Sequence, residues 1–381
     1  MGAGEKAVDA DGHKATLIAL TRPGGSLDSD SGHSTHKHSD WFDADGEPSR
    51  ERQKVHRKIL REFFAQNVAQ GGQAIMTAGP PGAGKSTALN DIYARTGTTA
   101  KDWLVLDADG FKDRILKQAI ADGSYDTHLT TDEIRQIEAG GEKIWPRERA
   151  ALVHEESSYL MKAARNEAIR QRRNIIIDGT MSSESKSKEL AAQLERSGYQ
   201  VKVVLVDAPK PVTEARADYR WRTGYENAAA GTAADPDDQL LGGRFVPAQI
   251  IDGMYRDESE SVCAASARAT ADGCQAVTEF DSYRVEQPAG APEHQLELSR
   301  KRDDGRWGKI RRHGAELARR HEKAEARKAA RAAAPPPPTD GGDSGGGGAG
   351  SGTCAVCGRP LRSAASIARG AGPTCAGHLA R

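Results

Sequence analysis

The chain alternates short, continuous apolar runs with longer amphipathic stretches between residues 73 and 285. The short runs predict strands at 73–78, 103–107, 174–178, 201–207 and 276–280. The longer stretches predict helices at 85–95, 110–121, 146–172, 183–196, 209–222 and 247–268. Near-continuous Ile, Val and Leu runs separated by helices are typical of parallel strands that are buried on both faces. The pattern therefore predicts an α/β fold with a mainly parallel sheet covered by helices on both faces.

The segments before this region follow other patterns. Residues 1–47 are rich in Gly, Ser, His and Asp, a composition that predicts a disordered or loosely packed segment. A helical pattern then begins after Ser49, a residue type that favours the N-cap, and ends at Gly71-Gly72. We therefore place the α/β domain at residues 48–285.

The remainder of the chain divides into three segments. A basic helical arm is predicted at 286–334, because residues 300–334 hold 13 Lys and Arg against 5 Asp and Glu. This arm is either a solvated helix or a weak nucleic-acid contact. The Pro and Gly run at 335–353 predicts a linker, and residues 354–381 form a separate module.

Composition and charge exclude some classes of protein. Lys plus Arg and Asp plus Glu both number 54, so the chain as a whole has no strong attraction to nucleic acid or to membranes. No apolar stretch approaches the roughly 20 residues of a membrane-spanning helix, and the acidic N-terminus lacks the apolar core of a signal peptide. We expect a cytoplasmic protein without a membrane partner.

A glycine-rich segment carries the strongest chemical signal. Residues 79–86 fit the phosphate-binding pattern G-x-x-x-x-G-K-[ST] at every fixed position, between a predicted strand and a predicted helix. In such a loop, backbone N–H groups surround the phosphates of ATP, the lysine reaches the β- and γ-phosphates, and the hydroxyl ligates Mg²⁺. The predicted nucleotide-binding residues are Gly79, Pro80, Pro81, Gly82, Ala83, Gly84, Lys85, Ser86 and Thr87.

Acidic residues follow three of the predicted strands. Asp107 and Asp109 follow the second strand, Asp178 ends the third, and Asp207 ends the fourth. The carboxyl ends of parallel strands meet at one edge of a sheet, where ligands bind. Phosphoryl transfer needs one carboxylate to hold Mg²⁺ and another to accept the proton of the attacking hydroxyl. Asp178 is the candidate for the first role and Asp109 for the second; alternatively, each acid caps a helix or lies in a loop.

In their order and spacing, these motifs resemble the zeta-toxin family of P-loop kinases over residues 50–285. The matching parts are the P-loop, Asp107-Ala108-Asp109-Gly110-Phe111-Lys112, His154-Glu155-Glu156-Ser157-Ser158, Asp178-Gly179-Thr180-Met181, Arg220 and Gly243-Arg244-Phe245-Val246-Pro247. The resemblance implies a kinase that uses ATP and Mg²⁺ to phosphorylate the 3′-hydroxyl of the amino sugar in UDP-N-acetylglucosamine. It also suggests an antitoxin protein as a partner.

The resemblance assigns a role to each catalytic candidate. Asp109 looks like the general base and Lys85 like the clamp on the β- and γ-phosphates. Ser86 and Asp178 look like the residues that hold Mg²⁺.

Four further residues take roles from the same resemblance. Glu155 and Thr180 would line the sugar-nucleotide pocket. Arg220 and Arg244 look like the arginines that stabilise charge on the transferring phosphoryl group. A guanidinium suits this role, because it is always charged and matches phosphate oxygens bidentately.

The chain departs from the family pattern at the acceptor side. A His-Pro signature is absent after Phe111-Lys112, and Asp113-Arg114-Ile115-Leu116 stands there instead. Asp178 occupies a position where some relatives carry Glu. The acceptor is therefore UDP-N-acetylglucosamine or another hydroxyl compound. The polar stretch 226–243 predicts a loop before Arg244, which is either a lid over ATP or an inert insertion.

A candidate metal module lies at the C-terminal end. Cys354 and Cys357 form one pair, Cys375 and His378 form a second pair, and 17 residues lie between the two pairs. Thiolate and imidazole ligands at this spacing predict a structural zinc site, similar to small zinc ribbons or knuckles. The alternative is a disulfide pair in a disordered tail.

Three functions are compatible with these features. The leading hypothesis is an ATP-dependent kinase for a small hydroxyl compound, of the zeta-toxin type. The second is a polynucleotide kinase that uses the basic arm and the zinc module to hold its substrate. The third is a nucleotide-binding switch that transfers no phosphoryl group.

Overall fold

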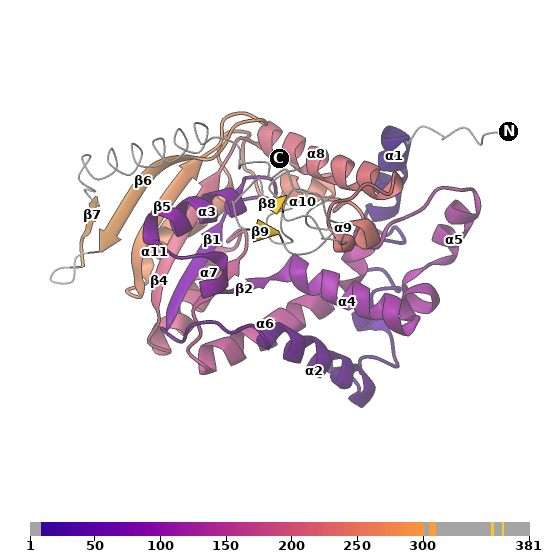
Figure 1. Ribbon diagram of the computed structural model, residues 1–381, viewed down its shortest axis with the longest axis horizontal. Coiled ribbons are helices and arrows are strands. Elements are labelled where there is room, and N and C mark those ends of the chain that lie inside the picture. Colours follow the sequence, from indigo (N-terminus) through magenta and orange to yellow (C-terminus); the bar gives the residue numbers. More distant parts are fainter. Residues whose placement is uncertain (1–8, 301–304, 310–351, 354–359, 362–381) are drawn as a thin grey trace, which may run out of the picture. The chain divides into compact units, whose positions relative to one another are not determined.

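The computed structural model describes residues 9–300, 305–309, 352–353 and 360–361. The chain divides into two compact units, residues 1–307 and 308–381. The main sheet has seven strands in the order β2-β3-β1-β4-β5-β6-β7 (Figure 1). Its strands are β1 (Gln73–Ala78), β2 (Leu104–Asp107), β3 (Ile175–Asp178), β4 (Gln200–Asp207), β5 (Val277–Arg284), β6 (Glu293–Arg300) and β7 (Trp307–Lys309). Two short strands, β8 (Gly352–Thr353) and β9 (Pro360–Leu361), pair antiparallel with each other.

Helices connect the strands. The α-helices are α1 (Ala10–Thr21), α2 (Arg50–Phe64), α3 (Lys85–Thr96), α4 (Ala108–Asp122), α5 (Asp132–Ala139), α6 (His154–Arg170), α7 (Glu184–Arg196), α8 (Lys210–Ala229), α9 (Pro236–Leu241), α10 (Ala248–Asp252) and α11 (Val262–Gly273). Short turns of other helix types are η1 (Thr35–Lys37), η2 (Ala100–Asp102), η3 (Tyr125–Leu129) and η4 (Pro146–Val153). In the described residues, no helix is both long and apolar enough to cross a membrane.

The strand pairing confirms the mainly parallel sheet. Strands β1 to β5 are parallel to one another, and β6 runs antiparallel to β5. Strand β1 is central, with β3 and β2 on one side and β4 and β5 on the other. In open sheets of this kind, ligands bind beyond the carboxyl ends of the strands, where the strand order reverses. The loop that follows β1 lies at that position.

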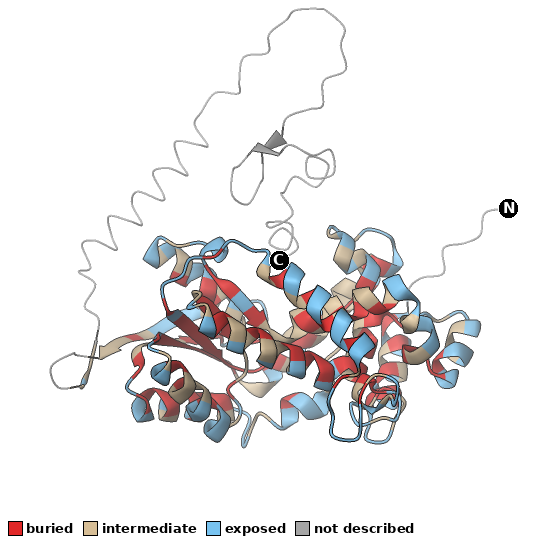
Figure 2. Cartoon of the chain, turned by 90° about the horizontal axis from the view of Figure 1, so that it is seen from below, coloured by how far each residue is buried: buried red, intermediate tan, exposed pale blue. Residues whose placement is uncertain are grey.

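Apolar residues on both faces of the sheet form the core, as the continuous apolar runs predict (Figure 2). On one face, alternate residues of β1, β3 and β4 pack with helices that include α4, α6, α7 and α11. On the other face, the intervening residues, among them Ile75, Ile176 and Val204, pack against α3. Burial on both faces holds the carboxyl ends of β1, β2 and β3 in fixed register.

The N-terminal segment corrects one prediction. Residues 10–21 form α1, which buries Leu17 and Leu20, and His13 forms hydrogen bonds with Glu142 (2.7 Å) and Glu148 (3.0 Å). The expectation of a disordered or loosely packed segment at 1–47 is wrong for residues 9–47, because one face of this segment is apolar and packs into the core. Residues 1–8 lie outside the described part of the chain.

Several predicted boundaries also differ. The helix predicted at 146–172 starts as the 3₁₀ turn η4, and α8 extends beyond residue 222 because Tyr225 and Ala228 are buried. The helix predicted at 247–268 is divided into α10 and α11, since Gly253 ends the first and a turn around Asp257 precedes the second. The predicted loop at 226–243 contains α9, in whose first turn the Asp237 N–H donates to the side chain of Asp235, the N-cap.

The C-terminal predictions are tested only in part. Residues 293–300 and 307–309 form strands, so the helical prediction for 286–334 is wrong there. Residues 301–304 and 310–334 of the predicted basic arm lie outside the described residues, as does most of the linker at 335–353. Cys354, Cys357, Cys375 and His378 also lie outside them.

Candidate active site

The phosphate-binding loop connects β1 to α3 and has the geometry that its sequence predicts. Gly84 is the N-cap of α3 with φ +95°, a left-handed conformation that suits glycine. Gly79 has φ +136°, and its N–H donates to the Thr180 carbonyl oxygen at 3.0 Å. The Lys85 ammonium group donates to the Gly79 carbonyl oxygen at 3.1 Å, so it lies folded over the loop. The loop therefore directs the positive end of α3 and one lysine toward the same space.

Two carboxylates meet at the neighbouring strand ends. Asp107 ends β2 and Asp178 ends β3, and the two residues are direct partners in the parallel register. Asp178 accepts a hydrogen bond of 2.6 Å from the Thr77 hydroxyl, and Thr77 also accepts one from the Gly179 N–H at 3.1 Å. Thr77 thus fixes the end of β3 to the strand that precedes the P-loop. Sequence reasoning missed this role, because Thr77 stands within an otherwise apolar strand.

Asp107 and Asp109 differ in their electrostatic surroundings. Asp107 caps α4 by accepting from the N–H groups of Asp109 (3.0 Å) and Gly110 (3.1 Å). Burial and the nearby carboxylates of Asp109 and Asp178 raise the pKa of Asp107 to about 6. Burial alone would raise the pKa of Asp109 too, but Arg244 and Lys112 outweigh it and lower that pKa. The low pKa keeps Asp109 ionised, as a proton acceptor requires, although it also weakens Asp109 as a base.

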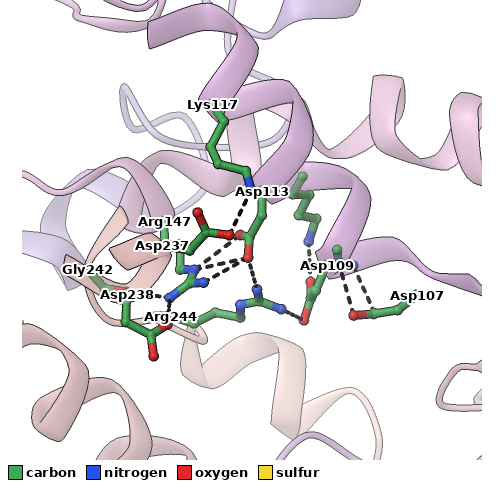
Figure 3. A network of polar contacts seen from close by, with 11 residues as sticks. Asp107, Asp109, Asp113, Lys117, Arg147, Asp237, Asp238, Gly242 and Arg244 are labelled. Carbon is green, nitrogen blue, oxygen red and sulfur yellow. Dashed lines mark hydrogen bonds and ion pairs between the residues drawn. The ribbon is translucent and has the colours of Figure 1, made fainter. Parts of the chain in front are cut away.

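Arg244 lies against the predicted base. Its Nη1 atom lies 2.5 Å from Asp109 Oδ2, and its Nη2 atom lies 3.0 Å from Asp113 Oδ2 (Figure 3). Asp113 in turn binds Arg147 bidentately, and Arg147 reaches Asp238 on α9 at 2.6 Å. The structure thus brings together two predicted residues, Asp109 and Arg244, and adds two that the sequence reasoning did not select, Asp113 and Arg147. Asp113 stands where the chain departs from the family pattern, and this departure was the one feature of the sequence that could have drawn attention to it.

Helix α8 connects the P-loop to the Arg244 segment. A Cβ atom at Gly82 would lie 2.7 Å from the Thr213 carbonyl oxygen, and a Cβ atom at Gly84 would lie 3.2 Å from Arg216 Nη2. Toward the end of the helix, a Cβ at Gly224 would lie 2.7 Å from Gly243 Cα, so the two backbones touch. Arg220 stands between these two contacts on the same side of the helix, four residues from each of positions 216 and 224. Arg216, which lies close to the P-loop, was not among the residues selected from the sequence.

The other predicted residues have mixed outcomes. Glu155 stands in the first turn of α6 with a side chain that is 56 % exposed, 3.9 Å from His154 Nε2. Thr180 lies beside the P-loop through its carbonyl oxygen, while its hydroxyl donates to Ser182 Oγ at 3.2 Å. Asp207 does not join the other acids, because it is buried and bonded to Ser261 (2.6 Å) and Arg284 (2.7 Å).

The donor set fits a divalent cation with oxygen ligands. Asp107, Asp109 and Asp178 converge at two adjacent strand ends, and the pKa of Asp107 is raised there first by burial and then by the two neighbouring carboxylates. Ser86 is exposed in the first turn of α3, at the edge of the P-loop. Carboxylate and hydroxyl oxygens are the protein ligands that Mg²⁺ takes beside nucleotide phosphates.

Comparison with protein families identifies this architecture. The zeta toxin family matches residues 64–287, a range that contains the P-loop, the strand-end acids and Arg244. The chain belongs to the zeta toxin family. A second match covers residues 346–380 and is to a family of unknown function, DUF6011. A comparison with the curated proteins gave no match.

Solved structures similar to this zeta toxin family member are distant in sequence. One is from the study of the PezAT chromosomal toxin-antitoxin system of Streptococcus pneumoniae, at 12% identity and a TM-score of 0.35, with 62% of this chain and 78% of that chain covered. A second is the AvrRxo1-ORF1:AvrRxo1-ORF2 structure with sulphate ions, at 14% identity and a TM-score of 0.45, covering 72% and 74%. The AvrRxo1-ORF1:-ORF2 structure with ATP has 15% identity and a TM-score of 0.42, covering 73% and 74%.

Proposed function

We propose that this chain is an ATP-dependent kinase that transfers the γ-phosphoryl group to a hydroxyl of a small acceptor, with UDP-N-acetylglucosamine as the first candidate. The observation that carries the proposal is the position of Asp109. Asp109 lies just beyond the carboxyl end of β2, which is separated from β1 by one strand, and it pairs with Arg244. The P-loop follows β1 itself. A phosphate clamp, a proton acceptor and a guanidinium are the parts that phosphoryl transfer needs.

The proposed reaction assigns one step to each group. Lys85 and the N–H groups of the P-loop bind the β- and γ-phosphates. Asp109 accepts the proton of the acceptor hydroxyl as its oxygen attacks the γ-phosphorus, and the bond to the β–γ bridging oxygen breaks to release ADP. Arg244 and Arg220 stabilise the charge on the transferring group. Ser86 and Asp178 would hold Mg²⁺, which when bound neutralises the phosphates.

The pairing of Arg244 with Asp109 implies an order of events. While Arg244 contacts Asp109, the pKa of this carboxyl stays low and the group accepts a proton poorly. Movement of Arg244 toward the γ-phosphate removes the largest influence that lowers this pKa. Asp109 then becomes a stronger base only when ATP is present.

The test is transfer by the purified full chain. The chain is incubated with Mg²⁺-ATP and with UDP-N-acetylglucosamine, free sugars or oligonucleotides, and mass spectrometry detects the gain of one phosphoryl group. We expect transfer to a small hydroxyl compound, which Asp109→Asn abolishes without loss of ATP binding and Lys85→Ala abolishes by weakening ATP binding. Glu184→Gln, which removes an exposed carboxylate on α7, serves as the control.

The outcomes separate the three functions. Transfer to UDP-N-acetylglucosamine supports the first acceptor, and transfer to another small compound retains the kinase and replaces the acceptor. Phosphorylation of oligonucleotide ends, with an affinity that falls steeply with salt, indicates a polynucleotide kinase instead. ATP binding with no transfer to any acceptor contradicts the proposed function.

The family also supports a toxic activity and an antitoxin partner for this chain. Induced expression should arrest growth for the unchanged chain and not for Asp109→Asn, since arrest then depends on phosphoryl transfer. Growth arrest by both would show that toxicity does not need the proposed base.

We propose in addition that Cys354, Cys357, Cys375 and His378 bind one structural Zn²⁺. The proposal rests on the donor set, since three thiolates and one imidazole close a tetrahedral site with no open position. Metal analysis of the purified chain should give one Zn²⁺ per chain, and Cys354→Ser with Cys375→Ser should remove it. Retention of zinc by the double variant would refute this assignment.

A further inference from the structure

The contacts of Arg244 point to a residue that has no part in the proposed chemistry itself. Arg244 divides its guanidinium between two carboxylates, Asp109 at 2.5 Å and Asp113 at 3.0 Å. Both carboxylates are on α4, one turn apart, so they present a pair of acceptors to one planar donor. Asp113 is 16 % exposed and Arg244 22 %, so solvent screens this contact only in part.

Asp113 is itself fixed by a second arginine. Arg147 binds it with Nε at 3.2 Å and Nη2 at 2.9 Å, and it is only 13 % exposed. The same guanidinium reaches Asp238 on α9 at 2.6 Å and the Gly242 carbonyl oxygen at 3.0 Å, two residues before Arg244 (Figure 3). Arg147 therefore holds both the partner of Arg244 and the backbone that carries Arg244.

The Gly242 contact leaves little freedom to this segment. A Cβ atom at Gly242 would lie 2.6 Å from Trp145 Cβ, and a Cβ atom at Gly243 would lie 2.2 Å from the Trp221 carbonyl oxygen. The chain before Arg244 is thus packed between η4 and α8. Packing thus fixes the backbone before Arg244, and the two carboxylates that bind its guanidinium hold the side chain.

We propose that Asp113 is a positioning residue that, held by Arg147, which Asp238 also binds, keeps Arg244 in place while Arg244 exchanges Asp109 for the γ-phosphate. This inference rests on the proposed function. Nη1 leaves Asp109, whereas Nη2 stays on Asp113, so that the guanidinium turns about a fixed contact. The residues of α9 then act on catalysis through Arg147 and Asp113, without touching ATP.

The test compares two carboxylates, Asp113 on α4 and Asp237 on α9, each of which forms an ion pair with a residue of another element. Asp113→Asn removes the charge that binds Arg244 and Arg147, whereas the control Asp237→Asn removes only the 2.7 Å pair with Lys117. In the full chain, we expect Asp113→Asn to lower kcat about 10- to 100-fold, the range for misplacing a catalytic group by about 1 Å. The KM for ATP should change less than about two-fold, because Asp113 contributes no ground-state binding. Asp237→Asn should leave kcat unchanged.

A double-mutant cycle separates positioning from a structural effect. In an Arg244→Gln background, Asp113→Asn should change kcat by less than about two-fold, because its effect passes through Arg244. An equal loss in both backgrounds, or equal behaviour of Asp113→Asn and Asp237→Asn, would overturn the inference. If Asp113→Asn does not fold, Arg147→Gln enters the same cycle with the same expectations. Absence of transfer by the unchanged chain contradicts the proposed function instead, so the two failures are distinguishable.

Discussion

Replacement of Glu156 by Gln tests how the fold supports the acceptor side of the site. Glu156 is fully buried in the first turn of α6, directly after His154 and Glu155. It accepts hydrogen bonds from Arg52 at 2.6 and 2.7 Å and from His56 at 2.7 Å, both on α2. These contacts join α2 to the turn that carries Glu155, one of the two residues predicted for the acceptor pocket.

The size of the effect follows from the pKa and from the burial of the partner. Burial alone would raise the pKa of Glu156, but the hydrogen bonds from His56 and Arg52 outweigh it and lower the pKa from 4.5 to about 2. A difference of this size corresponds to about 3 kcal/mol of folding free energy. Removing one member of a buried pair costs about 3–5 kcal/mol, and the Arg52 side chain is only 4 % exposed. We therefore expect Glu156→Gln to lower the free energy of unfolding by about 3–5 kcal/mol at pH 7.

The pH dependence gives a second measure of the same contact. Because the folded-state pKa is depressed, the stabilisation is present above pH 4.5 and is lost as the pH falls toward 2. The stability difference between the unchanged chain and Glu156→Gln should thus shrink by about 1–2 kcal/mol between pH 7 and pH 3.5. Urea unfolding at both pH values measures it, with Glu155→Gln on the exposed neighbour as the control. A difference that is below about 1 kcal/mol at pH 7, or that does not shrink at pH 3.5, would refute the reasoning.

Three further predictions test other parts of the molecule. Gly84→Ala should destabilise the chain by about 1–3 kcal/mol, because φ is +95°, and should abolish the increase in Tm on addition of Mg²⁺-ATP; an undiminished increase would contradict the P-loop assignment. His13→Gln tests a raised pKa: burial lowers the pKa of His13, but Glu148 and Glu142 outweigh it. The ion pair of His13 therefore stabilises the fold below pH 6.5, and this stabilisation is lost as the pH rises through the folded-state pKa of His13. The unfolding free energy of the unchanged chain should exceed that of His13→Gln by more at pH 5.5 than at pH 8.5. An equal difference at both pH values would exclude this ion pair. Asp207→Asn should lower stability by about 1–3 kcal/mol, since it breaks buried hydrogen bonds, and should leave kcat unchanged; a large loss of kcat would return Asp207 to the site.

The sequence predicts those parts of the site whose structure is determined by nearby residues. The conformation of the P-loop depends on glycines at fixed spacing, and the meeting of Asp107 and Asp178 follows from adjacent parallel strands with the same register. The apolar runs likewise predict β1 to β4 within one residue. In each case, the interaction that decides the structure lies within a few residues or follows from the period of the strand.

Long-range polar contacts could not be predicted in this way. Arg147 carries no local signal, since its role depends on Asp113, 34 residues away, and on Asp238, 91 residues away. The order of α1 depends similarly on contacts with residues more than 120 positions along the chain. A polar composition predicts disorder only when the few apolar residues find no partner, and here Leu17 and Leu20 enter the core of the domain.

The residue at which the chain departs from the family pattern, Asp113, also forms the contacts that the sequence did not predict. At the position after Phe111-Lys112, the chain has Asp113, and the structure uses this carboxylate to bind Arg244 and Arg147. Two guanidinium groups face this negative charge in a partly desolvated site and offset the cost of burying it. The departure from the family pattern at Asp113 and the presence of Arg147 therefore depend on each other. A comparison of kcat for Asp113→Asn, Arg147→Gln and the double variant would show this dependence as a loss for the double variant that is smaller than the sum of the two single losses.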